Sequence, residues 1–450
     1  MHRPLSLYTP LARGMDRGRF RGPLSLIMAW SGFATLAMAC GSDRSSGGSS
    51  WASTIDTIGD TTVIRTTGGS VWPDTAQLVP VVSVGVFDGA DEYMFGNVSS
   101  MAVTEQGELY VMDTHVPVLR KYDAAGTHLF DVGREGEGPG EYRRPDGGLA
   151  VLSDGRVVLR DPGNARLNVY AADGTFLDTW PLPSGGGFST GRKLYRDRGD
   201  SLYTMILLDR GLPVTEWRYG LATVTPAGEH TDTLAAPTWS FEPPVVSGSR
   251  EGSSSSQSVP FSASIEWAYS PLGYFVGSVT TDYRIDLLQD PPLRIERAYT
   301  PVPVMGEEAA EQEHRIIEQM RSNFGSWRWN GPPIPDAKPP IRELYVGEDG
   351  RIWAQVSTRG APRMSEEEAR TEEERSGDPQ IRFVESVAFD VFEPDGRYLG
   401  HVRGPDGFQS YPAPIFTRDS VWAAIRDDLD VITIVRLEIR QHEGDDETAS

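Results

Sequence analysis

Residues 100–132 and 148–180 carry the same residue pattern, so one piece of the chain is written twice. The repeated positions include Gly107 and Gly155, Asp113 and Asp161, Leu119 and Leu167, Tyr122 and Tyr170, and Gly126 and Gly174. A fixed period of this size is typical of folds built from stacked or radially arranged units. The repeat therefore constrains the fold of the whole chain more than any other feature of the sequence.

Each copy contains four short apolar runs that are separated by turn residues. In the second copy the runs cover 149–152, 157–159, 167–170 and 176–180. Asp154-Gly155 and Asp173-Gly174 lie between runs, and Asp-Gly predicts a tight hairpin turn because glycine accepts a positive φ. Four antiparallel strands in about 45 residues correspond to one blade of a β-propeller.

Weaker copies of the unit continue along the chain. We expect further innermost strands near Lys193, Ser262, Ile341 and Pro412. Together with the two clear copies, they predict an all-β, six-bladed β-propeller of four-stranded antiparallel blades over residues 61–440. Glycine and proline (48 and 33 of 450 residues) exceed the ordinary share of about 12%, as a turn-rich β chain requires. Seven blades, a β-sandwich pair or an open solenoid are the alternatives.

The last unit has only three evident strands of its own, at about 413–418, 420–426 and 430–440. Residues 81–86, from the N-terminal side, are the expected fourth strand. Such pairing would join the two ends of the ring and remove an open sheet edge, which is a liability in β proteins.

Residues 1–39 have the features of an export signal. Five arginines precede an apolar stretch over 24–39, which is shorter than the roughly 20 residues of a transmembrane helix. Ala37-Met38-Ala39 closes the stretch with small residues, as a cleavage site requires. We therefore interpret 1–39 as a signal peptide.

Cys40 is the only cysteine and directly follows the predicted cleavage site. A Gly/Ser-rich segment comes next, and the arrangement resembles that of bacterial lipoproteins, although Ala37 stands where leucine is usual. The resemblance implies that Cys40 is acylated, that 40–60 is a tether, and that the protein is anchored to a membrane of the cell envelope. Ordinary cleavage that releases a protein with a free thiol is the alternative.

The chain is strongly acidic, with a net charge of −22. Removing the signal peptide would make it more acidic still, and residues 441–450 add an acidic tail. A body of this charge argues against nucleic-acid binding and against direct docking on anionic lipid.

Three insertions interrupt the repeat, at 243–260, 303–340 and 361–380. The first is rich in Ser, Gly and Pro, and predicts a mobile surface loop. The third contains two runs of three glutamates, and predicts a solvated acidic loop with about one helical turn. A cation site in that loop is the alternative to a purely solvated face.

The insertion at 303–340, between blades 4 and 5, carries a predicted helix over 305–324. Its apolar residues recur at helical spacing: Ala309, Ile316, Met320 and Phe324. Trp327 and Trp329 follow the helix. One hypothesis makes the helix a lid over a mouth of the central channel, with both tryptophans in contact with a ligand. In the other, the helix caps blade edges and the tryptophans anchor it by packing.

A glycine-rich segment over 133–145 joins the two clear copies. Its glycines superficially resemble a phosphate-binding loop, but such a loop needs a helix N-terminus behind it, and here a strand is expected. Its glutamates would also repel an anion. We interpret the segment as a crossing between blades, in which Arg134, Arg143 and Arg144 pair with glutamates.

This segment resembles part of the NHL-type six-bladed β-propellers. The resemblance includes the two motifs that follow it, Asp154-Gly155-Arg156 and Gly163-Asn164-Ala165-Arg166. The resemblance is greatest to bacterial lipoproteins of that group, and is strong over 95–182. It departs at 114–117, where the Gly-Asn pattern is missing. It implies a fold, a surface location and a general binding role, without one particular activity.

Related six-bladed propellers include metal-dependent lactonases and an amidating lyase, with metal or catalytic residues at the channel mouth. Beyond the signal peptide the chain has six histidines: His115, His128, His230, His314, His401 and His442. They show no paired spacing, and no Gly-x-Ser-x-Gly motif is present. Asp113 and Asp161 recur at equivalent positions, which indicates a turn-bonding role. The sequence therefore predicts no catalytic, cofactor-binding or metal-ligating residue.

Two functions remain at this point. The first is a surface-anchored, non-enzymatic propeller that binds a protein or glycan through its loops. The alternative is a metal-dependent hydrolase or lyase with calcium or zinc at the channel mouth.

Overall fold

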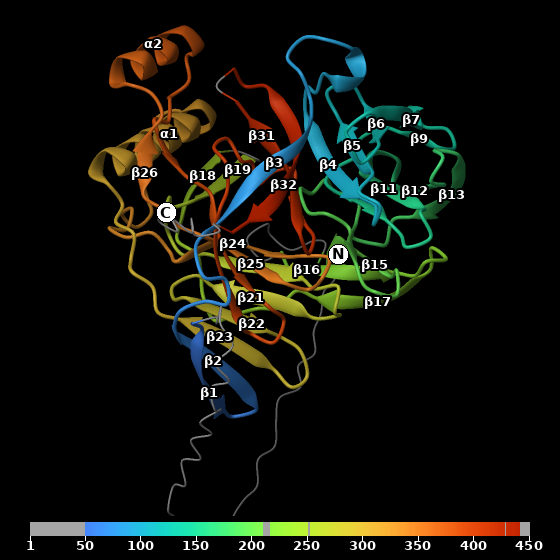
Figure 1. Cartoon of the computed structure of the whole chain (residues 1–450). Coiled ribbons are helices and arrows are strands. Elements are labelled where there is room, and N and C mark those ends of the chain that lie inside the picture. The colour runs from blue at the N-terminus through green and yellow to red at the C-terminus, as the bar shows by residue number, and fades with distance from the viewer. Residues whose placement is uncertain (1–49, 210–216, 251–252, 428, 442–450) are drawn as a thin grey trace, which may run out of the picture. The chain divides into compact units, whose positions relative to one another are not determined.

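Strands dominate the computed structural model, which describes residues 50–209, 217–250, 253–427 and 429–441 (Figure 1). The described residues lie in one of the two units into which the chain divides, Ser49–Ser450. They contain two α-helices, and neither is long and apolar enough to cross a membrane. The N-terminal signal and Cys40 fall outside the described residues.

The two clear repeat copies each form a four-stranded antiparallel sheet in chain order. The strands are β4 (Val98–Val103), β5 (Leu109–Asp113), β6 (Val118–Tyr122) and β7 (His128–Val132), then β10 (Leu149–Val151), β11 (Val157–Asp161), β12 (Arg166–Tyr170) and β13 (Phe176–Pro181). These bounds confirm the predicted runs. Gly155 has φ +86°, as the predicted Asp-Gly turn requires.

The next two units have the same antiparallel order. The third contains β14 (Tyr195–Arg196), β15 (Leu202–Leu207), β16 (Tyr219–Val224) and β17 (His230–Ala235), and the fourth contains β20 (Ile265–Tyr269), β21 (Phe275–Val279), β22 (Arg284–Leu287) and β23 (Leu293–Arg297). An N-terminal hairpin, β1 (Ala52–Ile58) and β2 (Thr61–Gly68), extends the fourth sheet because β2 pairs in parallel with β23. The predicted tether over 40–60 is therefore wrong at its end, since strand structure begins at Ala52.

The last two units share an eight-stranded sheet. Its order is β24 (Ile341–Val346), β25 (Ile352–Val356), β28 (Ala388–Phe392), β29 (Tyr398–Arg403), β3 (Ala76–Val84), β32 (Ile432–Arg440), β31 (Ser420–Arg426) and β30 (Ile415–Phe416). β3 pairs antiparallel with β32, and the two lie side by side in Figure 1. The prediction of an N-terminal fourth strand is confirmed, with the strand beginning at Ala76 instead of residue 81.

Short elements occupy the connections. They are the pairs β8 (Arg134–Glu135) with β9 (Glu141–Tyr142), β18 (Val245–Arg250) with β19 (Ser253–Ser258), and β26 (Gly360–Pro362) with β27 (Phe383–Glu385), and the 3-10 turns η1 (Asp91–Tyr93) and η2 (Pro162–Asn164). The interpretation of 243–260 as a loop is wrong, because β18 and β19 form a hairpin there. Its Val246 is buried against the following helix, a tertiary contact that local composition does not reveal.

The two helices are α1 (Gly306–Phe324) and α2 (Glu366–Ser376). α1 confirms the helix predicted over 305–324, and Ile316 and Met320 bury its apolar face against Val246. α2 is longer than the single turn expected. Ser365 caps it by accepting a hydrogen bond from the Glu368 amide, and Gly377 ends it in a left-handed conformation.

The hydrophobic core lies between neighbouring sheets. Tyr110 and Met112 of the first unit pack with Leu149 and Leu159 of the second, for example. Each sheet is buried on both faces where it has two neighbours, which explains why the strands carry apolar residues without strict alternation.

Candidate functional site

The first strands of the four-stranded units lie next to one another. β4 lies beside β10 and β30, and β20 lies beside β24. Backbone hydrogen bonds link further first-strand segments, from Gly147 N to Thr190 O and from Glu348 N to Phe416 O, both 2.9 Å. Side chains from several units therefore converge on one region.

A cavity of about 310 Å³ opens in this region, and we call it the channel cavity. Strands β20 and β24 and the segments before β14 and β30 line it. Its polar side chains are Arg192, Lys193, Tyr195, Glu266, Glu343, Tyr345, Ser410 and Tyr411. A small cavity with a few convergent polar groups is the usual form of a ligand site.

Glu266 on β20 accepts a hydrogen bond of 2.8 Å from Ser264 Oγ. The pKa of Glu266 is raised to about 7, chiefly by burial and also by the charge of Glu343, while the Ser264 hydrogen bond and Arg192 lower it. The carboxyl group is therefore close to half-protonated at neutral pH.

Glu343 on β24 accepts a hydrogen bond from the Tyr345 hydroxyl. Burial raises the pKa of Glu343 as well, against the effects of Tyr345 and Arg192. Among the ion pairs of the described residues, neither Glu343 nor Glu266 has a partner within 4.0 Å. Their remaining lone pairs are available to a ligand.

Arg192 supplies a positive charge beside these carboxyl groups. Its guanidinium stacks 4.1 Å from the Trp267 ring centroid. Nη1 also donates to the Trp267 carbonyl at 2.9 Å and to the Tyr195 hydroxyl at 3.2 Å. Stacking together with two hydrogen bonds holds the planar group in one orientation.

Tyr411 borders the channel cavity and is 48% exposed. It also lines an adjoining cavity of about 450 Å³ that includes Arg143 and Arg144. Tyr411 and Gly191 belong to both linings, so the two cavities meet at this aromatic side chain.

The channel cavity does not have the composition of a metal site. Among the described residues, no three His, Cys, Asp or Glu side chains come together in a way that could hold an ion. The cavity offers two carboxyl groups beside a guanidinium, which would compete with a cation for them. The described part of the chain therefore contains no group of side chains that fits the calcium or zinc of the alternative function.

Trp327 and Trp329, the predicted ligand contacts, lie in a hydrophobic cluster with α1 and the β18–β19 hairpin. Trp327 is 9% exposed, and its Nε1 donates to the Ser247 carbonyl at 2.8 Å. Trp329 Nε1 donates to the Gly331 carbonyl at 3.1 Å. These contacts support the packing-anchor alternative, and a ligand at either tryptophan stays a prediction.

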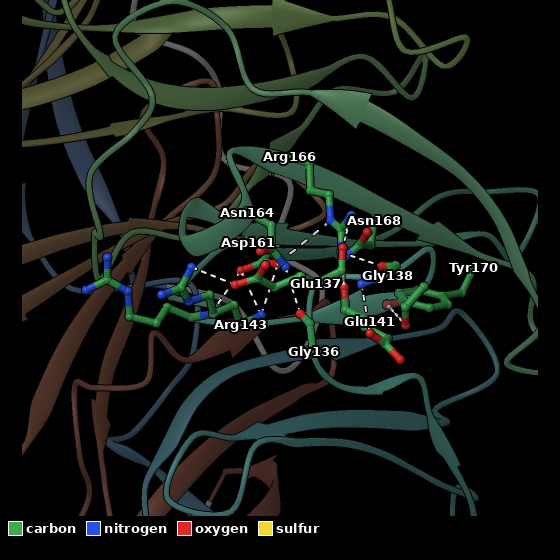
Figure 2. Close-up of polar contacts among 12 residues, drawn as sticks. Gly136, Glu137, Gly138, Glu141, Arg143, Asp161, Asn164, Arg166, Asn168 and Tyr170 are labelled. Atoms are coloured by element: carbon green, nitrogen blue, oxygen red, sulfur yellow. Dashed lines mark hydrogen bonds and ion pairs between the residues drawn. The ribbon is translucent and has the colours of Figure 1, made fainter.

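The glycine-rich segment over 133–145 connects the first unit to the second, and side-chain contacts hold it in place (Figure 2). Arg134 pairs with Glu141, and Arg143 pairs with Glu137. Figure 2 shows how Arg166, Asn168 and Tyr170 reach this segment, and they donate to the carbonyl oxygens of Gly138, Glu141 and Gly140 at 2.6–3.0 Å. The predicted crossing is confirmed for Arg134 and Arg143. Arg144 differs, because its side chain makes no such pair among the described contacts.

Asp113 and Asp161 bond backbone amides, as their repetition indicated. Asp113 accepts from the Gly96, Asn97 and His115 amides at 2.8–3.0 Å. Asp161 accepts from the Arg143 and Arg144 amides and from Asn164 Nδ2 (Figure 2). The predicted turn-bonding role is confirmed for both.

Sequence reasoning missed Glu266, Glu343 and Arg192. A signal was present, because both glutamates interrupt a first strand that is otherwise mostly apolar. The equivalent strand β10 of the second copy has no charged residue.

No family model matches the chain, and no curated protein matches it. A solved member of the DUF4221 family from Bacteroides vulgatus is 10% identical, covering 82% of this chain and 99% of that one, with a TM-score of 0.42. A gluconolactonase from Xanthomonas campestris is 13% identical, with coverages of 83% and 89% and a TM-score of 0.36. A virginiamycin B lyase from Staphylococcus aureus is 11% identical, with coverages of 76% and 95% and a TM-score of 0.35. Similarity at this level assigns neither a family nor an activity.

Proposed function

We propose that this chain is an exported, lipid-anchored, six-bladed β-propeller of NHL type that binds a small polyhydroxylated ligand, such as a sugar unit, in its channel cavity. The observation that carries the proposal is the convergence of Glu266, Glu343 and Arg192 from three different units on one cavity. A ligand site on the axis of a ring needs such a convergence.

Six blades are supported by the strand order. Each of the six groups of four strands is antiparallel, and the sixth takes its outer strand from the N-terminal side. Contacts between successive first-strand segments favour a closed ring. In this ring, α1 belongs to an insertion between the fourth and fifth blades, after β23 and before β24.

Anchoring rests on Cys40 and on the export signal that precedes it. In a bacterial host, the wild-type chain should incorporate radiolabelled palmitate and sediment with membranes. Cys40→Ser should lose both properties. Equal labelling of the two chains would overturn the anchor.

The ligand class follows from the chemistry of the cavity. Carboxyl oxygens accept hydrogen bonds from hydroxyl groups, and a carboxyl that is half-protonated also donates. Tyr411 provides an exposed aromatic surface at the opening, against which an apolar sugar face can pack. The proposal places the ligand in the channel, and it narrows the earlier expectation of a protein or glycan bound through the loops.

Isothermal titration of the mature chain with a panel of neutral mono- and disaccharides tests this proposal. At least one sugar should bind, and Glu343→Gln and Tyr411→Ala should each weaken its affinity. Glu229→Gln, at an exposed turn, is the control and should bind as the wild type does. Binding that survives both channel substitutions would remove the ligand from this cavity.

Acid–base catalysis is a second candidate, and the pKa of Glu266 favours it. A general acid or base is most effective when its pKa lies near the working pH. A hydrolase or lyase of this kind would use Glu266 to move a proton, with Arg192 stabilising negative charge on the reacting group. Turnover of any bound sugar derivative should then depend on Glu266, and Glu266→Gln should abolish turnover while retaining binding.

A further inference from the structure

A second polar cavity, of about 380 Å³, lies between β23 and β28, and we call it the Asp390 cavity. Its polar lining includes Arg297, Lys338, Ser357, Asp390 and His401. Its apolar walls come from Val302, Pro339, Pro340 and Val356. No residue belongs to the linings of both this cavity and the channel cavity.

Asp390 is 1% exposed and is fully engaged by its neighbours. Its Oδ1 accepts from the Tyr398 hydroxyl and from His401 Nδ1, both at 2.9 Å. Its Oδ2 accepts from the Tyr283 hydroxyl at 2.7 Å and from Arg297 Nη1. Burial alone would raise the pKa of Asp390, but the bond from His401 and the charge of Arg297 hold it below its usual value. This carboxylate has no capacity left for a ligand.

The Lys338 ammonium group also has no hydrogen-bonding capacity left for a ligand. Its side chain is wholly buried, and Nζ contacts Glu308 Oε1 at 2.6 Å and Glu385 Oε1 at 3.1 Å. Nζ also donates to the Thr358 carbonyl at 3.2 Å. An ammonium group has three hydrogens, so three acceptors use them all.

Ser357, Arg297 and His401 are among the lining residues that keep hydrogen-bonding capacity. The Ser357 hydroxyl is buried, and it has no hydrogen-bond partner among the described residues. Arg297 has five N–H groups, of which the ion pair with Asp390 engages Nη1, and its side chain is 29% exposed. His401 has one ring nitrogen committed to Asp390, so only Nε2 remains for a ligand.

We propose that the Asp390 cavity binds a small organic acid. Its carboxylate would pair with Arg297 and accept a hydrogen bond from Ser357, because a guanidinium matches the geometry of a carboxylate and the orphaned hydroxyl needs a partner. The apolar body of the acid would lie against Val302, Pro339 and Val356. The stacking of Arg297 on the Tyr398 ring, at 4.2 Å, keeps the guanidinium in place for this contact.

Calorimetric titration of the mature chain with benzoate tests the proposal, because benzoate combines a carboxylate with an apolar ring. Benzamide has the same shape without the charge, and inorganic phosphate has the charge without the apolar body. Benzoate should bind saturably, and the other two probes should bind at least about tenfold more weakly.

Two substitutions locate the ligand. Ser357→Ala should weaken benzoate binding about tenfold, and Arg297→Lys, which keeps a cation beside Asp390, should weaken it by at least as much. Ser278→Ala is the matched control, because its hydroxyl is also buried and unpartnered but lies outside the cavity lining. That control should bind benzoate as the wild type does.

Several outcomes would overturn the proposal. They are absence of benzoate binding, equal affinity for benzamide or phosphate, or unchanged affinity in Ser357→Ala. Benzoate binding that is lost in Tyr411→Ala and kept in Ser357→Ala would move the ligand to the channel cavity. The sugar titrations above use different probes, and Ser357→Ala and Arg297→Lys lie outside the channel cavity, so the two proposals fail independently.

Discussion

Leu78 on β3 lies directly opposite Ile439 on β32. These two strands are the first and the last, in chain order, of the eight-stranded sheet. The pairing continues to Val84 and Ile434. The last unit thus depends on a strand that is contributed by the N-terminal part of the chain. Non-local closure of this kind carries a high loop-closure cost, which the buried side chains of β3 must offset.

Leu78→Ala is expected to destabilise the protein by about 3 kcal/mol, because Leu78 is 3% exposed and packs in the core of the last two units. Urea unfolding followed by tryptophan fluorescence measures the change. Gln77→Ala, on the exposed face of the same strand, is the control and should change stability by less than about 0.5 kcal/mol. Equal effects of the two substitutions would contradict the burial of Leu78 in this core.

Glu266 should make stability depend on pH. Its pKa is raised from 4.5 to about 7, so between these values the folded protein holds a proton that the unfolded chain releases. The free energy of unfolding should therefore fall as the pH rises from 4.5 to about 7, by on the order of 3 kcal/mol, and then level off.

Chemical unfolding of the wild type and of Glu266→Gln at pH 5 and pH 8 tests this linkage. Glutamine cannot ionise, so the variant should gain stability relative to the wild type at pH 8 but not at pH 5. Glu229→Gln should leave the pH dependence unchanged. A constant difference between wild type and Glu266→Gln at both pH values would rule out the raised pKa.

Asp161→Ala and Asp113→Ala should each lower the free energy of unfolding by about 3 kcal/mol. Each substitution removes a buried carboxylate that accepts from at least two backbone amides, and bonds to a charged acceptor are among the stronger ones. Thermal unfolding compares them with Asp173→Ala, at an exposed turn, which should cost less than about 1 kcal/mol. A large difference between Asp161→Ala and Asp113→Ala would show that the two positions are not equivalent.

Trp327→Ala should destabilise the protein by about 3 kcal/mol, since it removes a buried ring and leaves the Ser247 carbonyl with one fewer donor. Arg328→Ala, next to it and exposed, is the control. Differential scanning calorimetry separates the two hypotheses for this region. A Trp327→Ala variant that keeps its stability but loses ligand binding would support the lid.

The strand pattern was readable from sequence because each four-stranded unit is local. Runs such as 157–159 need only neighbouring residues to form hairpins, and Asp-Gly turns mark their ends. The β18–β19 hairpin was missed because its Ser-rich strands have little β signal, and contact with α1 stabilises them instead. Among the described strands, β1 pairs only with its neighbour β2, and this hairpin joins a sheet far along the chain because β2 pairs with β23, which a tether prediction from local composition does not reveal.

The sequence does not reveal which acidic and basic groups line the same cavity. Glu266 and Glu343 stand in different units, and Ser357 and His401 lie on opposite sides of an insertion. Local spacing determined the repeat, the turns, the helix at 306–324 and the roles of Asp113 and Asp161, because these depend on residues close in sequence. Only the packing of one sheet against the next decided which carboxyl groups are buried, which hydroxyl has no partner, and where the cavities lie, since burial and charge coupling arise between units that the chain separates.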